Sequence, residues 1–584
     1  MILPKRFPAC AALCLLAALR ATAQTPPPAA PATIPAPQRV FHHLLVAESV
    51  EAAQTLFPDT ASGFVVLSPG LVLFDLAELN HRLAPARGRP IEQNILGAIE
   101  NALEAYFREA GYPKADAIVP SQSIAEGHIR FIVTLGEKNA AAKPPSVWGI
   151  RNIDMKGGRW FSHSLLQDNL RIGQGRTIAL SELEQAINWT NNNPFRRVKV
   201  HLEPVPNSTA EADLTVTVLD ALPLRVSATI DNAGNDAIGK RRYIAAASYS
   251  NLWGLDHQLG YQFITTDKAR FFRVHGMDYR VPLPWRHTLQ ASASYLEAKP
   301  EFFGGVFISK GESINADLRY SLPLRFGNNS LEASASVSFK QTNNNLLFFD
   351  TLAQTTKTDI VQFTFGLSGV WRDRRGAWGL GANVTASPGG LTPRNTTTAF
   401  DAGRHGGGDS ARLGATASYI YLNVSAQRFL TLAPGWDLLF RGTAQISQAN
   451  LLASEQINLG GANSVRGFQE NSASGDNGFV LSTEFMPPSW KVNIPRISKL
   501  RGPLESRLLA FVDLGDTSLR RNLAHERNRN ALASAGVGLR SNLAHHFSLT
   551  FDYGWQLSQP NADQRAAGAE RDRGRGHAKA TLAF

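Results

Sequence analysis

Residues Leu331-Glu-Ala-Ser-Ala-Ser-Val-Ser-Phe-Lys340 alternate an apolar and a polar side chain from end to end. Because successive side chains of a β-strand point to opposite faces, this pattern predicts a strand with one apolar and one polar face. The same alternation recurs in other parts of the chain, at Leu259–Phe263, Leu289–Tyr295, Val361–Leu367, Leu549–Tyr553 and Ala578–Phe584. We therefore expect a long region of paired strands in which every strand turns its apolar face to the same side.

The β-type region extends from about residue 221 to residue 584, a length that a soluble β-sandwich seldom reaches as one domain. At roughly 23 residues for each strand and its connection, the region accommodates about 16 antiparallel strands. Closing them into a barrel leaves no free sheet edge, and the apolar faces then meet lipid. No later segment has the roughly 18 consecutive apolar residues of a membrane helix. The expected fold is therefore mainly β, with a transmembrane antiparallel β-barrel at 221–584 in contact with outer-membrane lipid.

Both ends of the chain indicate export. A basic pair, an apolar run and a small-residue cleavage pattern give residues 1–23 the form of a signal peptide. Both cysteines lie inside it, so the sequence excludes disulfides and cysteine-bound metals from the mature chain. Residues 24–39 are rich in proline and alanine and predict an extended linker. The terminal Phe584 lies on the apolar face of the last predicted strand, where outer-membrane barrels present a residue to their assembly machinery, which we expect to be a partner.

Between the linker and the β-type region, the sequence predicts one small α+β unit twice. The first unit, at 61–138, reads as a strand, two helices and two strands, with a helix at Ile91–Ala110 where apolar residues recur at helical spacing. The second unit, at 146–220, repeats this composition, with helices expected at Phe161–Asn169 and Ser181–Asn191. We therefore expect two tandem α+β domains ahead of the barrel.

A glycine-rich loop in the β-type region carries one arginine between apolar residues. It reads Leu459-Gly-Gly-Ala-Asn-Ser-Val-Arg-Gly-Phe-Gln-Glu470. In the later strand Leu508–Gly515, alternation places Asp513 on the face opposite an aliphatic one. If the aliphatic face meets lipid, Asp513 points into the lumen and can pair with an inserted Arg466.

These two segments resemble the lumen-folded loop and the acidic wall strand of two-partner secretion transporters, members of the outer-membrane assembly-factor superfamily. The two α+β units resemble the family's polypeptide-transport-associated (POTRA) domains, and Tyr106–Pro113 and Asn193–Arg196 carry that likeness. The resemblance implies that Arg466 clamps the loop to Asp513. It implies a loop latch of Val465, Arg466, Gly467 and Phe468, a barrel-wall partner of Phe511, Asp513 and Gly515, and loop support from Gly460, Gly461, Asp476, Gly478 and Glu484.

The resemblance also implies a function. It predicts an outer-membrane transporter that exports a large exoprotein in extended form, with POTRA domains in the periplasm recognising this client through residues that the sequence leaves open. Members of the family can carry a helix that plugs the barrel, and the helix-compatible segment 40–58 stands at that place. The resemblance implies no cofactor or metal, and we expect a monomer.

Two other functions stay open from the sequence. One is an insertase that assembles other outer-membrane barrels, although such bacterial proteins usually carry more than two POTRA domains. The other is a passive porin or receptor for small solutes. An assay of proteins in the medium and in the outer membrane separates the three.

Catalysis and nucleic-acid binding are not expected. The chain has 59 basic and 48 acidic residues and a net charge of +11, but the basic residues are scattered, which argues against nucleic acid. Gly234–Lys240 is close to a phosphate-binding loop, yet Arg241 stands where that loop requires Ser or Thr. No nucleophile elbow or zinc-protease motif occurs in the sequence. We therefore predict that the protein is not an enzyme.

Overall fold

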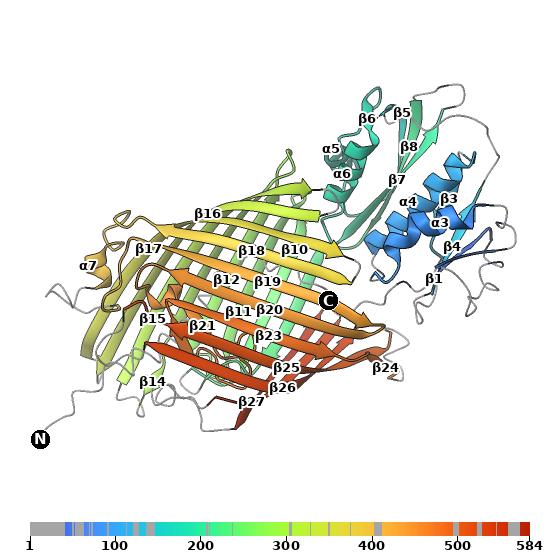
Figure 1. Ribbon diagram of the computed structural model, residues 1–584. Helices are drawn as coiled ribbons and strands as arrows, with labels where there is room; N and C mark the ends of the chain where they lie inside the picture. Colours follow the sequence, from blue (N-terminus) through green and yellow to red (C-terminus); the bar gives the residue numbers. More distant parts are fainter. Residues whose placement is uncertain are drawn as a thin grey trace, which may run out of the picture.

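The chain folds into a closed β-barrel with two small α+β domains beyond one of its ends, as the computed structural model shows (Figure 1). The structure describes residues 41–584 except 42, 50–51, 53–63, 69–70, 72–73, 90, 92, 113, 121–127, 136–146, 206–207, 209–210, 236–237, 303–306, 327–328, 349–350, 374, 402–410, 495–501, 522–527, 545 and 559–572. The signal peptide and the linker expected at 1–39 lie outside the described residues.

The barrel has 16 antiparallel strands, and it closes where its last strand pairs with its first. Residues Lys579–Ala583 of the last strand pair with Ser227–Asp231 of the first. The fold class predicted from the alternation is therefore confirmed. The strands are β9 (Leu224–Asp231), β10 (Arg242–Leu252), β11 (His257–Thr266), β12 (Phe272–Pro282), β13 (Thr288–Ala298), β15 (Phe307–Phe326), β16 (Asn329–Phe348), β17 (Thr351–Asp373), β18 (Gly376–Ser387), β19 (Tyr419–Ala433), β20 (Trp436–Ser447), β23 (Asn477–Met486), β25 (Leu504–Ser518), β26 (Arg529–Leu543), β27 (Phe547–Gln556) and β28 (Gly574–Ala583), with short segments β14 (Glu301–Phe302) and β24 (Trp490–Val492) following β13 and β23 in the barrel.

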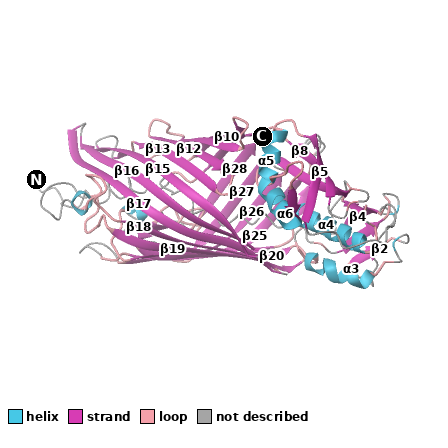
Figure 2. Ribbon diagram, turned by 90° about the horizontal axis from the view of Figure 1, so that it is seen from above, coloured by secondary structure: helices cyan, strands magenta, loops and turns pink. Residues whose placement is uncertain are grey.

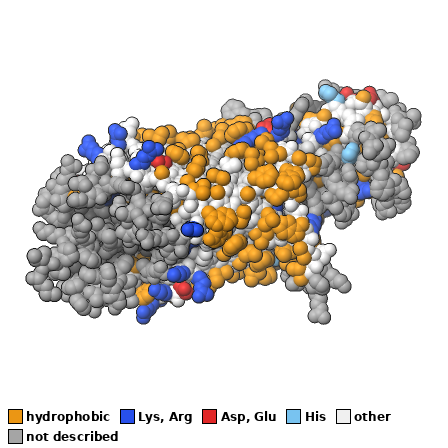
Figure 3. All heavy atoms as spheres, turned by 60° about the horizontal axis from the view of Figure 1, so that its bottom comes forward, with side chains coloured by type: hydrophobic (Ala, Val, Ile, Leu, Met, Phe, Trp, Pro, Cys, Tyr) orange, Lys and Arg blue, Asp and Glu red, His pale blue; other side chains and the backbone are white. Residues whose placement is uncertain are grey.

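Alternation separates the two surfaces of the barrel wall. On β25, Leu508 and Val512 are 51% and 45% exposed on the outside, whereas Phe511 and Asp513 are 3% and 0% exposed on the inside. Figure 3 shows the result on the face in view, a broad area of hydrophobic side chains over the barrel. A polar interior therefore coexists with an apolar exterior because each strand changes face at every residue.

The two ends of the barrel differ in their connections. Short turns, such as residues 253–256 between β10 and β11, lie at the end next to the small domains (Figures 1 and 2). The opposite end carries longer connections, among them residues 388–418, with the short helix α7 (Thr397–Phe400), and residues 448–476. The second of these connections contains the arginine-bearing loop.

The two small domains share one architecture. The first contains β1 (His43–Ala47), β2 (Val65–Leu67), α3 (Leu76–Leu83), the 3₁₀ turn η2 (Ala84–Ala86), α4 (Gln93–Glu109), β3 (Asp116–Ile118) and β4 (His128–Thr134), with strand order β2-β1-β4-β3. The second contains β5 (Val147–Gly157), α5 (His163–Leu170), β6 (Thr177–Ala179), α6 (Leu180–Thr190), β7 (Arg196–Pro204) and β8 (Glu211–Asp220), with order β6-β5-β8-β7. In each sheet the central pair is parallel, and the last two strands of the domain form an antiparallel pair.

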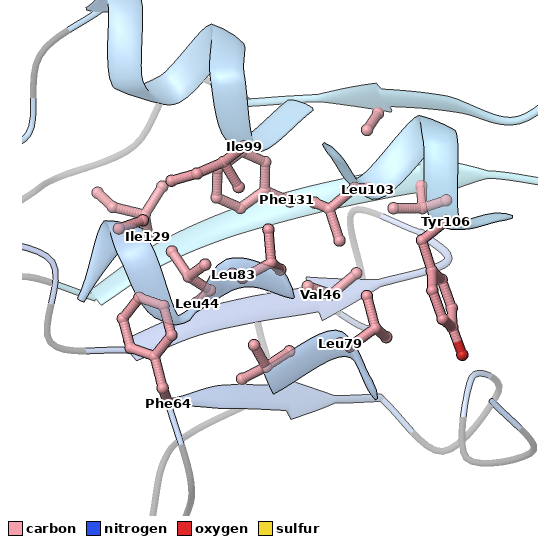
Figure 4. Close-up of a cluster of buried hydrophobic side chains, with 14 of the residues drawn as sticks. Leu44, Val46, Phe64, Leu79, Leu83, Ile99, Leu103, Tyr106, Ile129 and Phe131 are labelled. Carbon is pink, nitrogen blue, oxygen red and sulfur yellow. The ribbon is translucent and has the colours of Figure 1, made fainter. Parts of the chain in front are cut away.

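Helices α3 and α4 cover one face of the first sheet (Figure 4). Leu79 and Leu83 of α3 and Leu103 of α4 pack into the same buried cluster as Leu44 and Phe131 of the sheet. The sequence predicted α4 from this helical spacing of apolar residues. Within the described part of the chain, no helix has both the length and the apolar character needed to cross a membrane.

The prediction of a helix at 40–58 is wrong for the residues of this segment that the structure describes. Residues His43–Ala47 form strand β1, which pairs with β2 and β4. The side chains from Leu44 to Ala47 are all buried. A parallel strand that is covered on both faces appears in the sequence as a continuous run of apolar residues. A short segment of a buried helix can show the same run, so the pattern does not distinguish the two. The first domain therefore begins before residue 61, and the segment expected to open it, Phe64–Leu67, contains the edge strand β2.

A buried ion pair joins the second small domain to the turn between β10 and β11 of the barrel. Arg196 pairs with Asp256, and the side-chain amide of Asn193 donates to the same carboxylate at 2.7 Å. The guanidinium of Arg196 also lies 4.7 Å from the ring centroid of Phe161. The segment Asn193–Arg196 thus connects the domain to the barrel wall.

We predict that Asp256→Ala loosens this joint. The substitution leaves the guanidinium of Arg196 buried without its carboxylate, a change that typically costs about 3–5 kcal/mol. Spin labels on α5 and on the turn between β12 and β13 should then give a broad distance distribution in place of a narrow one. Arg151→Ala, which breaks an exposed ion pair with Asp213 inside the same domain, is the matched control and should keep the distribution narrow. A narrow distribution in Asp256→Ala would contradict the role given to this pair.

Candidate functional site in the barrel lumen

The connection between β20 and β23 folds back along the inner wall of the barrel. After the 3₁₀ turn η5 (Ala453–Glu455), it forms a small hairpin of β21 (Ile457–Leu459) and β22 (Ala473–Gly475). We call residues 460–472, between these two strands, the loop tip. The tip carries Arg466, which is only 2% exposed.

Arg466 and Asp513 form a two-pronged ion pair. Arg466 donates from Nε to Oδ2 of Asp513 at 2.7 Å and from Nη2 to Oδ1 at 2.8 Å. The backbone N–H of Arg466 donates to Oδ2 as well, at 3.1 Å. Three hydrogen bonds therefore join one loop residue to one strand residue, a geometry in which the planar guanidinium matches the carboxylate.

Side chains from neighbouring strands complete the surroundings of Arg466. Nη1 donates to Glu484 of β23 at 2.7 Å and lies 3.7 Å from the carboxylate of Asp552 on β27. Nη2 donates to the hydroxyl of Ser482 at 3.2 Å, and this hydroxyl donates in turn to Asp513. The guanidinium carbon lies 3.5 Å from the ring centroid of Phe511, which is the range of a cation–π contact.

Gly467 brings the backbone of the tip against the barrel wall. Its φ of +88° favours glycine, and an added Cβ would lie 2.7 Å from the carbonyl oxygen of Gly554 on β27. Its N–H donates to Nε2 of His577 at 3.1 Å, and its carbonyl accepts from the amide of Gln556 at 2.7 Å. Strands β27 and β28 therefore bind the tip through its main chain.

Apolar residues before and after Arg466 in the sequence pack into a buried cluster. Val465 and Phe468 are fully buried in a cluster with Leu459, Ala473 and Leu532. A Cβ on Gly515 would lie 2.7 Å from the side chain of Leu459 and 3.0 Å from that of Val465. The barrel wall thus carries a glycine, Gly515, at the point where the apolar residues of the loop approach it.

The residues expected to support the loop lie around its base and its wall. Gly460 and Gly461 have positive φ angles and follow β21, Gly478 lies in β23 against Asp516 and Thr517 of β25, and Glu484 contacts Arg466 directly. Asp476 pairs with Arg412 at 2.6 Å and accepts the N–H of Leu451 and of Arg520. Burial acts to raise the pKa of Asp476, but the hydrogen bonds and charge of Arg412 outweigh it and hold the pKa below its ordinary value.

The sequence did not identify Ser482, Asp552, Gln556 and His577 as neighbours of the tip. Alternation alone puts Asp552 and His577 on the inner faces of their strands. Their approach to Arg466 and Gly467 depends on the register of β25 to β28, which pairs Asp552 with His577 and Ser534 with both Asp513 and Gln556. A sequence gives the face of a side chain but not this register.

The described part of the chain holds no cluster of three or more His, Cys, Asp or Glu side chains suited to a metal ion. The carboxylates around Arg466 are instead paired with arginines. Glu484 also pairs with Arg441, and Asp552 with Arg540. The arrangement binds the guanidinium of Arg466 through carboxylates, two of which also pair with other arginines.

The family of this chain follows from comparison with known proteins. A model of the haemolysin secretion/activation proteins ShlB/FhaC/HecB matches residues 211–541, and a model of the ShlB-type POTRA domain matches residues 65–136. The chain belongs to this family. The match covers the barrel strands from β9 to most of β26, including the loop tip and its wall strand.

Curated relatives of this chain are named as transporters. The heme/hemopexin transporter protein HuxB of Haemophilus influenzae is 24% identical over 421 residues, which are 70% of this chain and 68% of HuxB. The outer membrane transporter CdiB of Escherichia coli is 24% identical over 513 residues, which are 86% of this chain and 79% of CdiB.

Solved structures share the fold. CdiB from Escherichia coli superposes with a TM-score of 0.60 at 19% identity and covers 100% of both chains. BamA from Haemophilus ducreyi without its first three POTRA domains has a TM-score of 0.50 at 15% identity, covering 87% of this chain and 97% of BamA. At these identities the likeness concerns the fold alone.

We predict that Gly467→Ala unseats the loop tip. Alanine at this position meets both an unfavourable φ, typically about 1–2 kcal/mol, and the carbonyl of Gly554. A thiol reporter at Asn463→Cys, an exposed position of the tip, should therefore react with a maleimide faster than in the parent. Gly390→Ala is the matched control because its φ is +73° and no atom lies within 4 Å of the added Cβ. Equal labelling rates in both variants would show that close contact with β27 does not seat the tip.

Proposed function

We propose that this chain is an outer-membrane transporter that secretes a large partner exoprotein in extended form through its barrel, with the two POTRA domains in the periplasm receiving the client. Membership of the haemolysin secretion/activation family supports secretion of an exoprotein partner. The observation that carries the mechanism is the loop tip, which Arg466 holds on the inner wall of the barrel. A client that passes through the lumen requires this loop to move.

The chemistry of the tip suits a latch that opens and closes. A charge-assisted hydrogen bond is worth roughly 1.5–3 kcal/mol before water and salt weaken it. Arg466 makes several such bonds to Asp513 and Glu484, so the closed tip is stable at rest. Water and the polar backbone of an extended client can replace hydrogen bonds of this kind one at a time, whereas a dry apolar plug offers no such exchange.

The small domains are suited to receive an extended chain. Among the described strands, each sheet has two outer strands that pair with one neighbour each, β2 and β3 in the first domain and β6 and β7 in the second. An extended segment can add to the outer edge of such a strand by backbone hydrogen bonds, which require little of its sequence. The joint between Arg196 and Asp256 keeps β7 close to the barrel entrance, because Arg196 is the first residue of that strand.

An insertase is the second candidate, because the BamA fold resembles this one. The curated relatives favour secretion, since CdiB is an outer membrane transporter and HuxB a heme/hemopexin transporter. A porin for small solutes is the third candidate, and a loop seated in the lumen argues against free solute flow. Loss of other barrels or of solute uptake distinguishes these functions from export.

We predict that Arg466→Ala abolishes secretion while the barrel remains inserted. The variant removes the only guanidinium that joins Asp513, Glu484 and Ser482 among the described residues, so the tip loses its seat. The assay compares large proteins in the culture medium, with the outer membrane analysed in parallel. Export predicts loss of one exoprotein with other barrels at normal levels.

Arg529→Ala is the matched control for Arg466→Ala. Arg529 of β26 pairs with Asp516, which lies on β25 as Asp513 does, but the side chain of Arg529 is 74% exposed. This variant should secrete normally. Normal secretion by an inserted Arg466→Ala transporter would refute the latch. In cells that lack the gene, general loss of barrels would favour the insertase, and unchanged proteins would favour the porin.

A further inference from the structure

The base of the loop is fixed to strands of the wall that precede those seating Arg466 in the barrel order. Glu455, in the 3₁₀ turn that leads into the hairpin, accepts from Nζ of Lys340 on β16 at 2.8 Å and 3.1 Å. The hydroxyl of Tyr421 on β19 donates to the same carboxylate at 3.0 Å. The amide of Gln445 on β20 donates to the backbone carbonyl of Glu455 at 2.9 Å. Three strands therefore hold one residue of the loop.

Both charges of this pair are buried. The side chains of Lys340 and Glu455 are 8% and 1% exposed. Burying an ammonium and a carboxylate is costly unless they pair with good geometry and further hydrogen bonds. Here both carboxylate oxygens are satisfied, so the pair is stable in this closed form.

The returning arm of the loop has an equivalent pair. Asp476 precedes β23 and binds Arg412 of the connection 388–418. The two pairs therefore pin both arms of the hairpin, Glu455 on the outgoing arm and Asp476 on the returning one. A buried apolar cluster fills the space beside them. It contains Ile360, Phe400, Ala415, Ala417, Tyr419, Tyr421, Leu451 and Leu452.

We propose that Lys340–Glu455, together with Arg412–Asp476, is a hinge that stays closed while the loop tip leaves its seat. The inference rests on the proposed function, because it presumes that the tip moves during export. Arg466 is eleven residues after Glu455 and ten before Asp476. At up to roughly 3.3 Å per extended residue, each arm lets the tip lie as far as about 30 Å from a base that does not move. Lys340 and Glu455 are thus positioning residues that return the tip to Asp513 after each client.

Cysteine cross-links separate the hinge from the latch, because the predicted mature chain has no cysteine of its own. At the latch, Val465→Cys with Gly515→Cys places two thiols within disulfide reach, since a Cβ on Gly515 would lie 3.0 Å from a methyl of Val465. At the hinge, Lys340→Cys with Glu455→Cys is joined by a bismaleimide whose length matches the two removed side chains.

The hinge predicts opposite results for the two cross-links. Without reagent, Lys340→Cys/Glu455→Cys should secrete about tenfold less than the parent, because two short side chains leave a void and no longer span the hinge, unlike a pair of full-length neutral side chains. Cross-linking should restore secretion to within about twofold, since a closed hinge is compatible with export. Because a Cβ on Gly515 crowds Leu459, the latch pair is compared only with itself, and oxidation should block secretion relative to the same variant kept reduced.

Two results decide against parts of this account. If the hinge cross-link blocks secretion as completely as the latch disulfide, the base of the loop must open and the hinge is refuted while the latch stands. If neither cross-link affects secretion, the loop does not move during export, and the proposed latch fails together with the hinge. Thiol labelling of Asn463→Cys in client-free vesicles supplies a second readout. Lys340→Met should raise the labelling rate about tenfold, and Lys340→Met/Glu455→Gln should return it toward the parent because no unpaired charge remains.

Discussion

The structure depends on the cost of burying one positive charge. Arg466 is carried on a loop yet almost removed from solvent, so every part of its surroundings must offer a compensating group. Asp513 supplies the carboxylate, Glu484 a second one and Phe511 a ring face. Three arginines and three carboxylates alternate there, because Arg441 shares Glu484 and Arg540 shares Asp552. A cluster with equal numbers of positive and negative charges holds the loop at rest. Because each carboxylate shares its charge among neighbours, no single hydrogen bond of the cluster is too strong to be replaced by one to water or to a client.

The barrel makes such a site possible on a membrane protein. Because alternate residues of each strand face opposite sides, Asp513 can be fully buried in the lumen while Val512 and Leu514 beside it face outward. The same rule places Lys340 inside, one residue after Phe339, where it can reach Glu455 of the loop. The wall thus presents charged partners on two sets of strands, one set for the tip and one for its base.

The sequence was informative where a local pattern decides the structure. Period-two alternation predicted the barrel and the inward face of Asp513, and helical spacing predicted α4. It misled at His43–Ala47, because a strand covered on both faces loses its alternation. Apart from Arg466 with Asp513 and the other loop and wall residues that the family resemblance supplied, it was silent on partners far apart in the chain. Lys340 and Glu455 are 115 positions apart, and His577 reaches Gly467 only through the register of four strands. Contacts of this kind depend on barrel closure, which no short segment encodes.

The central claim is that the loop tip leaves its seat when a client occupies the lumen. The most direct measurement is the distance between a spin label on Asn463→Cys, in the tip, and one on Val512→Cys, on the outer surface of β25, in transporters at rest and with a client stalled by a fused, rapidly folding domain. The account predicts a short, narrow distribution at rest and a longer, broader one with the stalled client. An unchanged short distance with a client verified in the lumen would contradict it.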